Sequence, residues 1–238
     1  MKKIRIVSAT TKDENGFWRD TLLGQSLSLC PRQVLPRISV TFKNSGNRRR
    51  GLSKIYNSFL RSKYSEDILL FVHDDVYLHD WQIEHRLNDA IERFDVVGLA
   101  GNKNPDFAEP SWALGWNPMK YPKGWQPKKY LSGSVGHVAG ANMIVSYYGN
   151  APQECKLLDG LFLAINTAKL IEKSVKFDEQ FDFHFYDLDF CRGCLKKNLK
   201  LGTWPISVTH ASGGAYGCPE WESAKKKYLL KWSVVKAR

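Results

Sequence analysis

The feature that most constrains the fold is a run of five large apolar residues that ends in a histidine and two acids. Residues 68–72 are Ile-Leu-Leu-Phe-Val, and His73, Asp74 and Asp75 follow directly. Because the run is short and has no polar position for solvent, it predicts a buried strand of a parallel sheet. Adjacent carboxylates at the end of such a strand are costly unless a cation or hydrogen bonds compensate them. We therefore expect a binding site at this strand end, with an Asp-Asp surface turn as the alternative.

The first hundred residues have the pattern of an α/β fold. Strand-like runs begin at Ile4 and cover residues 37–42 and 95–99, whereas apolar residues recur at helical spacing over residues 52–60 and 83–94. We expect Asp80 to cap the second of these helices. The order is strand, loop, strand, helix, strand, helix, strand, which is typical of nucleotide-binding folds. Their ligands bind beyond the carboxyl ends of the strands, and the two adjacent acids lie at such an end.

The second half of the chain is less regular. Residues 102–130 contain three tryptophans, several prolines and glycines, and little periodicity. We interpret Trp112 and Trp116 as either part of a sugar-stacking pocket or part of a loop that packs its own rings. Strand-like runs return at residues 142–145, 161–165 and 205–208, and a helix is expected from Asp187 until Gly202 ends it. With no linker and no repeat, the chain is predicted to be one continuous domain.

The composition indicates an anionic partner without identifying it. The formal net charge is +11, and 8 tryptophans and 10 tyrosines offer flat surfaces to sugars, bases or membrane interfaces. Five irregularly spaced cysteines suit a reducing compartment, and the first residues lack the apolar segment of a signal peptide. We therefore predict a cytoplasmic protein. The basic and aromatic residues 221–232 predict either a peripheral contact with anionic lipid on the inner membrane face or a packed terminal helix.

Two further groups of polar residues could do chemistry. Asp187 and Asp189 alternate with aromatic residues where the late helix should start, so each could be a helix cap or a general base. His210 follows the last strand-like run and could be a metal ligand or a structural histidine.

Five segments, in their order along the chain, resemble one enzyme family. They are LSKIYN, LLFVHDDV, LLDGLFLAI, FDFHFYDLDFCRGC and VTHASGG. They are similar to segments of bacterial GT-A glycosyltransferases, and most closely to the family-two-like group of inverting sugar transferases. The resemblance implies a single GT-A domain over residues 1–238, with a Rossmann-like mixed sheet flanked by helices. It also implies that residues 1–101 bind the nucleotide sugar and that residues 102–238 form the acceptor and catalytic half.

The resemblance implies roles for individual residues as well. Asp75 and His210 would bind a divalent metal, Mn2+ or Mg2+, although His73 stands where many relatives have an acid. Asp187, or alternatively Asp189, would be the catalytic base. The residues expected to face the nucleotide sugar are Ser8, Thr10, Asn44, Lys54, Asn57, His73 and Asp74. Those expected to shape the donor and acceptor pocket are Asp159, Gly160, Trp112 and Trp116.

The function that follows from the resemblance is a metal-dependent, inverting, hexosyltransferase-like glycosyltransferase. It would move a sugar from a nucleotide-sugar donor to a glycan or glycolipid acceptor in bacterial surface polysaccharide or lipopolysaccharide synthesis. One alternative is a metal-dependent nucleotide-sugar or phosphate hydrolase that uses the same acids. The other is a non-catalytic basic module that binds nucleic acid, but the basic residues are scattered and match no RNA-binding signature, so we expect no nucleic-acid partner.

Overall fold

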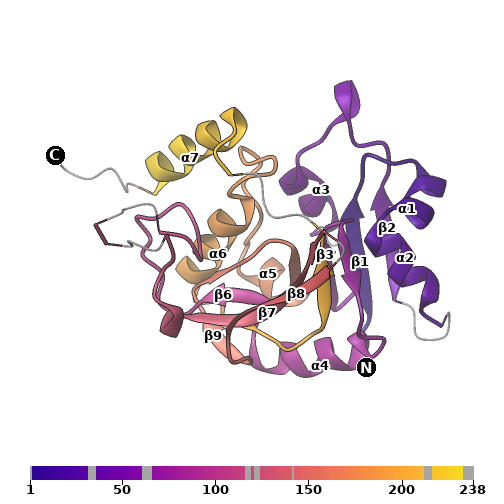
Figure 1. The fold of residues 1–238 in the computed structure, drawn as a ribbon, viewed down its shortest axis with the longest axis horizontal. Coiled ribbons are helices and arrows are strands. Elements are labelled where there is room, and N and C mark those ends of the chain that lie inside the picture. Colours follow the sequence, from indigo (N-terminus) through magenta and orange to yellow (C-terminus); the bar gives the residue numbers. More distant parts are fainter. Residues whose placement is uncertain are drawn as a thin grey trace.

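Two mixed β-sheets form the centre of the molecule, and helices pack around them (Figure 1). The computed structural model describes residues 2–31, 36–60, 66–115, 119–120, 124–140, 142–211 and 216–232. The helices are α1 (Glu14–Asp20), α2 (Leu22–Leu29), α3 (Leu52–Phe59), α4 (Ile83–Arg93), α5 (Thr167–Glu172), α6 (Tyr186–Lys196) and α7 (Pro219–Lys231), with short 3-10 turns at Gly46–Arg48 and Lys128–Tyr130. The strands are β1 (Ile4–Ala9), β2 (Arg37–Thr41), β3 (Ile68–Val72), β4 (Val76–Leu78), β5 (Val96–Gly98), β6 (Ala100–Asn102), β7 (Leu131–Ala139), β8 (Asn142–Gly149), β9 (Gln153–Cys155), β10 (Leu157–Leu158), β11 (Phe162–Asn166), β12 (Leu201–Thr203) and β13 (Val208–His210).

The larger sheet has the strand order β2-β1-β3-β11-β5-β12-β9. β1 is parallel to β2 and β3, whereas β11 runs antiparallel between β3 and β5. All five residues of β3 are buried, which confirms the strand predicted at residues 68–72. Its second neighbour is nevertheless antiparallel, because β11 returns from the later half of the chain to fill the place beside β3.

The smaller sheet has the order β10-β6-β7-β13-β4, and β8 pairs with β7. β13 is antiparallel to β4, with His210 opposite Val76. Since β4 starts directly after Asp75, this pairing brings a histidine from far along the chain next to the acids that follow β3. On its other side β13 is parallel to β7, with His210 opposite His137.

Helix α3 is tied to the segment that precedes α6. In the core between them, the Tyr56 ring stacks on Phe71 at 4.3 Å and meets Phe177 edge-on at 5.4 Å. The side-chain amide of Asn57 donates to the Phe177 carbonyl and its oxygen accepts from the Phe177 amide, both at 2.9 Å. Two buried hydrogen bonds to the backbone of one residue fix the path of this segment toward the start of α6.

Helix α7 is a packed terminal helix. Its Trp221 and Tyr228 are buried against the body of the protein, while Leu230 is 72% exposed. In Figure 1 it lies above α6. Nothing in the described ranges is a helix with both the length and the apolar character needed to cross a bilayer.

The structure differs from the sequence-based expectation in several places. The strand expected at residues 205–208 begins only at Val208, as β13. Helices α1 and α2 occupy the predicted loop between the first two strands, and β7 precedes the strand expected at residues 142–145. Helix α4 begins at Ile83 with Gln82 as its N-cap, so Asp80 stands too early to cap it and accepts from the Gln82 amide instead. Gly202 does not end α6 but lies in β12, where a β-carbon would come within 2.5 Å of the Phe94 ring.

Candidate functional site

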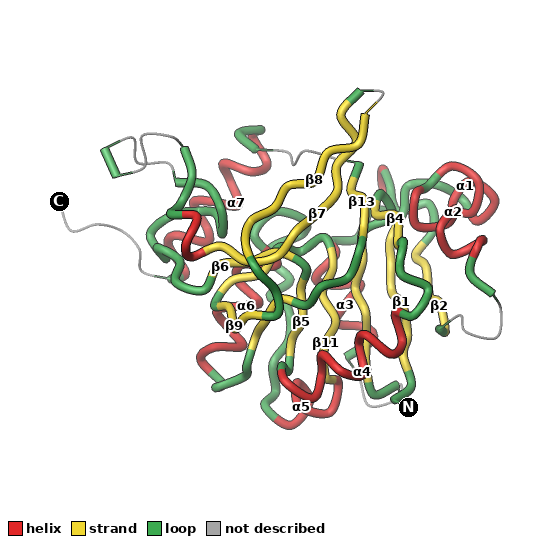
Figure 2. The backbone as a smooth tube through the Cα atoms, turned by 60° about the horizontal axis from the view of Figure 1, so that its bottom comes forward, coloured by secondary structure: helices red, strands yellow, loops and turns green. Residues whose placement is uncertain are grey.

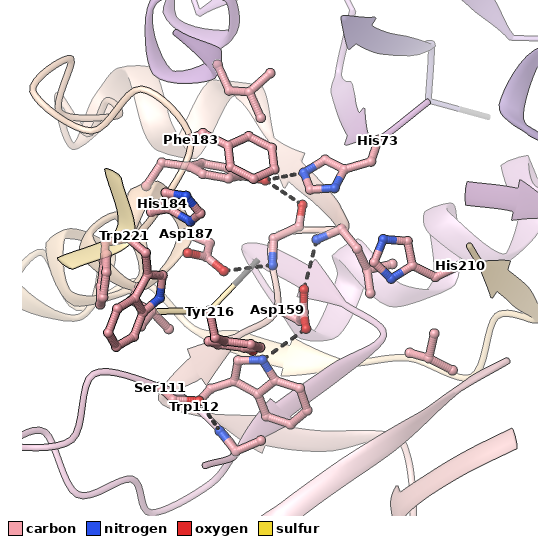
Figure 3. Close-up of a pocket in the computed structure, with 18 of the residues that line it drawn as sticks. His73, Ser111, Trp112, Asp159, Phe183, His184, Asp187, His210, Tyr216 and Trp221 are labelled. Atoms are coloured by element: carbon pink, nitrogen blue, oxygen red, sulfur yellow. Dashed lines mark hydrogen bonds between the residues drawn. The ribbon is translucent and has the colours of Figure 1, made fainter. Parts of the chain in front are cut away.

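A cavity of about 700 Å3 lies where the end of β3, strand β7, the start of α6 and the end of β13 meet (Figure 3). Both polar and aromatic residues line it, and the two kinds are in contact, as where Phe183 stacks on His73 and Trp112 bonds Asp159. Figure 3 places His73 and His210 on one side of the Asp159 carboxylate, and Asp187 on the other.

Backbone hydrogen bonds hold the segment after β3 from two sides. The His73 amide donates to the Leu161 carbonyl, just before β11, at 3.1 Å. The Asp74 carbonyl accepts from the Leu23 amide of α2 at 3.0 Å. The chain therefore leaves β3 along a fixed path, and the side chains of His73, Asp74 and Asp75 all reach the cavity.

Three of the cavity residues form a group suited to a metal ion. Ligand atoms of His73, Asp75 and His210 lie within 4.8 Å of one another. The His210 Nε2 atom is 3.3 Å from Asp75 Oδ1. Burial lowers the pKa of His73 and so favours its neutral imidazole, the form that binds metals. Burial also opposes protonation of His210, but its hydrogen bond and attraction to Asp75 outweigh this and raise the pKa of His210.

The hydroxyl of Tyr186 sets the tautomer of His73. Its oxygen lies 2.9 Å from His73 Nε2, and its proton is donated to the Gly160 carbonyl at 2.7 Å. Burial raises the pKa of Tyr186 well above its usual value, so the hydroxyl keeps that proton. Because a carbonyl can only accept, the Tyr186 oxygen must accept from His73, which therefore carries its proton on Nε2. Nδ1 of His73 is left with the lone pair that a metal ligand needs.

Asp187 is placed by the first turn of α6 and by Gly160. Its Oδ2 atom accepts a hydrogen bond from the Gly160 amide at 3.0 Å. A β-carbon at Gly160 would lie 2.5 Å from the Tyr186 hydroxyl oxygen and 2.8 Å from Asp187 Cβ. Only glycine therefore allows the backbone to approach both side chains this closely.

Burial makes Asp187 a weaker acid than a solvated aspartate. It raises the pKa of Asp187 to about 7, the negative charge of Asp159 adds to the effect, and the amides of Leu188 and Gly160 oppose it. Asp159 itself is held at both oxygens: Trp112 Nε1 donates to Oδ2 at 2.9 Å and the Leu161 amide donates to Oδ1 at 3.1 Å. A carboxylate with a pKa near 7 can take up a proton at neutral pH, as a general base must.

Phe185, directly before α6, has a left-handed backbone with φ 65°. This conformation strains a bulky residue, at a cost of about 1–3 kcal/mol, and persists only where packing enforces it. The Phe185 ring packs on Trp221 and Tyr228 of α7, with ring centroids 5.4 and 5.2 Å apart. Helix α7 thus holds the turn from which Tyr186 and Asp187 enter the cavity.

Most of the residues selected from the sequence meet at this cavity. Those that line it are His73, Asp74, Asp75, Trp112, Asp159, Gly160, Asp187 and His210. Those that lie elsewhere among the described residues are Ser8, Thr10, Asn44, Lys54, Asn57 and Asp189. Trp116 falls outside the described residues.

The residues away from the cavity have other surroundings. Burial raises the pKa of Asp74, and a hydrogen bond from Thr10 opposes this, so Thr10 lies directly behind the cavity wall. Asn44 bonds the backbone of Arg50 through both ends of its amide, and Lys54 is exposed on α3. Ser8 is fully buried in β1.

Asp189, the alternative base, points away from the cavity. Its Oδ1 atom is 2.7 Å from Lys231 Nζ and accepts a hydrogen bond from Trp232 Nε1 at 2.8 Å. These contacts pair the carboxylate with a cation of α7. Of the two acids at the start of α6, Asp187 is the one that faces the cavity.

The cavity residues that sequence reasoning did not select include Tyr186, His137, Tyr148 and Tyr216. The tyrosine next to Asp187 is visible in the sequence, but its hydrogen bonds reach residues 26 and 113 positions away, which no local pattern indicates. His137 lies in a glycine- and serine-rich stretch that has no apolar alternation. Its ring centroid is 6.2 Å from that of His210.

Comparison with known proteins identifies the fold. No family profile and no curated protein sequence matches the chain. Among solved structures, the mannosyltransferase PcManGT from Pyrobaculum calidifontis, solved with GDP-Man and Mn2+, matches 100% of this chain with a TM-score of 0.52 and 11% identity. GalNAc-T7, solved with UDP, GalNAc and Mn2+, matches 97% of this chain with a TM-score of 0.58 and 9% identity. The match spans 65% of the first protein and 48% of the second. The predicted α/β fold of the GT-A glycosyltransferases is thereby confirmed.

The raised pKa of Asp187 gives a prediction about stability. Its pKa is about 7 in the folded chain and about 4 in the unfolded chain, so the folded state is penalised as pH rises through this window. An amide does not ionise. We expect Asp187→Asn to raise the melting temperature more at about pH 8.5 than at about pH 4.5, by an amount equivalent to a few kcal/mol.

Thermal unfolding of both proteins at the two pH values measures this difference. Asp89→Asn on the exposed face of α4 is the matched control and should change little at either pH. An equal shift for Asp187→Asn at both pH values would show that burial does not hold the proton on this carboxyl group.

Proposed function

We propose that the protein is a metal-dependent glycosyltransferase that moves a hexose from a nucleotide-sugar donor to a glycan or glycolipid acceptor with inversion. The observation that carries this proposal is one cavity that contains both a His-Asp-His group and a half-buried carboxylate with a pKa raised to about 7. The two fold neighbours, each solved with a nucleotide or nucleotide sugar and Mn2+, support it.

The three possible metal ligands, His73, Asp75 and His210, fit a divalent cation such as Mn2+ or Mg2+. His73 Nδ1, the Asp75 carboxylate and a ring nitrogen of His210 would hold it, and two imidazoles with one carboxylate suit Mn2+ better than Mg2+. When bound, the cation supplies positive charge to a departing diphosphate.

Asp187 is the proposed base. Its carboxylate would accept the proton of the acceptor hydroxyl, and the Gly160 amide would keep Oδ2 in place during the transfer. Asp159 repels the negative charge of Asp187 and so keeps it basic, while Trp112 holds Asp159 itself. The Trp112 ring meets Tyr148 edge-on at 5.0 Å, and this aromatic wall offers a stacking surface for a sugar.

We assign the donor to residues 1–101 and the acceptor and base to residues 102–238 of a single domain. On the donor side, Asp74 lines the cavity beside His73 and Asp75, with Thr10 behind it. Asn44 and Lys54 remain predicted nucleotide contacts, whereas the side chains of Ser8 and Asn57 are buried. The proposed setting is the synthesis of bacterial surface polysaccharide or lipopolysaccharide, at the cytoplasmic side of the membrane. The net charge of +11 suits phosphorylated donors and anionic acceptors.

The first test separates donor binding from transfer. We expect UDP, GDP, CMP or dTDP to raise the melting temperature only with Mn2+, and Asp75→Ala to abolish this shift. Asp187→Asn should keep the Mn2+-dependent shift and lose transfer by about 100-fold or more, because it removes only the base. Asp189→Asn, the second acid of the same helical turn, should retain transfer.

The readout of this test is thermal shift followed by transfer of labelled sugar from the nucleotide that binds. Full activity of Asp187→Asn would remove this residue from the role of base. If the nucleotide sugar were cleaved as fast without an acceptor as with one, the protein would instead be a hydrolase that uses the same acids.

The tautomer of His73 gives a second prediction. Tyr186→Phe removes the oxygen that accepts from Nε2 and leaves the ring free to protonate Nδ1 instead. Because loss of a partner behind a metal-binding histidine costs about 10-fold to 100-fold in affinity, we expect Mn2+ to bind more weakly by that factor. Calorimetric titration with Mn2+ measures it, and Tyr228→Phe, which removes a buried hydroxyl outside the cavity, is the control. Unchanged Mn2+ affinity in Tyr186→Phe would contradict the assigned tautomer.

The stereochemistry of transfer can be read from the product. A single displacement, in which Asp187 activates the acceptor directly, reverses the configuration at the anomeric carbon. We expect the proton NMR spectrum of the first product to show the inverted anomer. A retained anomer would show that the reaction follows another course, even if donor and metal bind as proposed.

A further inference from the structure

Strands β7 and β8 form a hairpin whose far end leaves the body of the protein. Strand β13 pairs with β7 only at Gly136 and His137, and in the described part of the chain β8 pairs with β7 alone. Where Val138 pairs with Met143 and Ala139 with Asn142, the hairpin is therefore a two-stranded ribbon. Figure 2 shows it projecting past the neighbouring strands β13 and β4.

The hairpin is uncharged and exposes apolar side chains. Residues 131–153 contain no Asp, Glu, Lys or Arg, although these residues make up 25% of the chain. The exposed fraction is 47% for Val138, 64% for Met143, 52% for Ile144 and 69% for Val145. Apolar residues so exposed and so close together mark an interaction surface.

The exposed side chains occupy both faces of the ribbon. Val138 is paired with Met143, so these two share one face, and Val145 joins them two residues along. Ile144 is paired with His137 and lies on the opposite face. If the free edge of β8 paired with a second copy of this chain, the backbone groups along that edge would form hydrogen bonds, but the apolar side chains on both faces would stay exposed to water. An apolar medium that surrounds the ribbon would cover the side chains on both faces.

The order of residues along the face that carries Val138 and Met143 matches the order of groups at a membrane interface. Met143 and Val145 are followed on the same face by Tyr147, which is 55% exposed. The ammonium group of Lys128 lies 5.8 Å from the centre of the Tyr147 ring. A protein segment that enters an anionic bilayer typically has apolar residues in the acyl region, aromatic rings at its boundary and cations among the headgroups. The hairpin has these three kinds of group in the same order.

We propose that the β7–β8 hairpin binds an anionic lipid bilayer, with Val138, Met143, Ile144 and Val145 in the acyl boundary and Tyr147 and Lys128 among the headgroups. The net charge of +11 complements such a surface. The hairpin also forms part of the cavity wall through His137, so the bound bilayer would lie beside the cavity. A protein bound in this way would take a lipid-linked acceptor as its substrate. Only this assignment of the acceptor rests on the proposed transferase function.

Vesicle binding of the whole protein, without donor or acceptor, tests the proposal. We expect sedimentation with vesicles made of equal parts phosphatidylcholine and phosphatidylglycerol, and weaker sedimentation with phosphatidylcholine alone. The double variant Met143→Ser/Val145→Ser leaves the charge unchanged and should bind the anionic vesicles about tenfold more weakly, because it removes apolar surface that enters the bilayer. Both positions are exposed, so its melting temperature should match the original.

Leu230→Ser is the matched control, because Leu230 is the exposed apolar residue of the other candidate membrane contact, helix α7. It should bind as the original does. Equal binding by the double variant, or an equal loss in Leu230→Ser, would overturn the proposal. So would a dimer in light scattering that the double variant converts to monomer, since the hairpin would then serve a second copy. None of these outcomes depends on whether sugar transfer is found.

Discussion

The hydroxyl group of Tyr186 is the contact on which the geometry of the site depends. It joins the residue that follows β3, the turn that precedes β11 and the first turn of α6. A phenol has one proton, and the Tyr186 hydroxyl donates it in a hydrogen bond to the Gly160 carbonyl. His73 must therefore donate from Nε2 to the Tyr186 oxygen, which fixes its tautomer. The same bond sets how far α6 can stand from β3. Because Asp187 is the next residue in the chain, the same contact fixes its position relative to the metal-binding group.

The two acids at the start of α6 show how environment separates identical side chains. Asp187 and Asp189 are two residues apart. Asp189 is buried, whereas Asp187 is half-buried at the cavity wall. Asp189 pairs with Lys231 and accepts a hydrogen bond from Trp232, and these contacts fasten α7 to α6. They oppose the rise in the pKa of Asp189 that burial causes. Asp187 meets Asp159 and backbone amides, so its charge is only partly compensated. One acid therefore contributes to the fold and the other retains affinity for a proton, which fits the roles of anchor and base.

The parts that the sequence predicts are those whose signal is local. The strand at residues 68–72 follows from its unbroken apolar run, and the amphipathic helices α3 and α4 follow from the spacing of their apolar residues. Helices α1 and α2 were missed because they are short and contain Gly16 and Gly24, yet their caps were present, since Asp13 and Thr21 accept from the amides of those glycines. Strand β7 was missed because glycine and serine replace the apolar alternation. The hydrogen bonds between His73, Tyr186 and Gly160 depend on which strands become neighbours, and no local pattern encodes that.

The strained turn at Phe185 has a consequence for the order in which the site is completed during synthesis. A growing chain that has emerged only as far as His210 already contains the three residues of the metal-binding group together with Asp159, Tyr186 and Asp187. It does not yet contain Trp221 and Tyr228, the two rings against which Phe185 packs. Until these residues emerge from the ribosome, little holds Phe185 in a conformation that costs about 1–3 kcal/mol, so the start of α6 can relax. The nascent protein would thus form its sheets first and complete its reactive centre last.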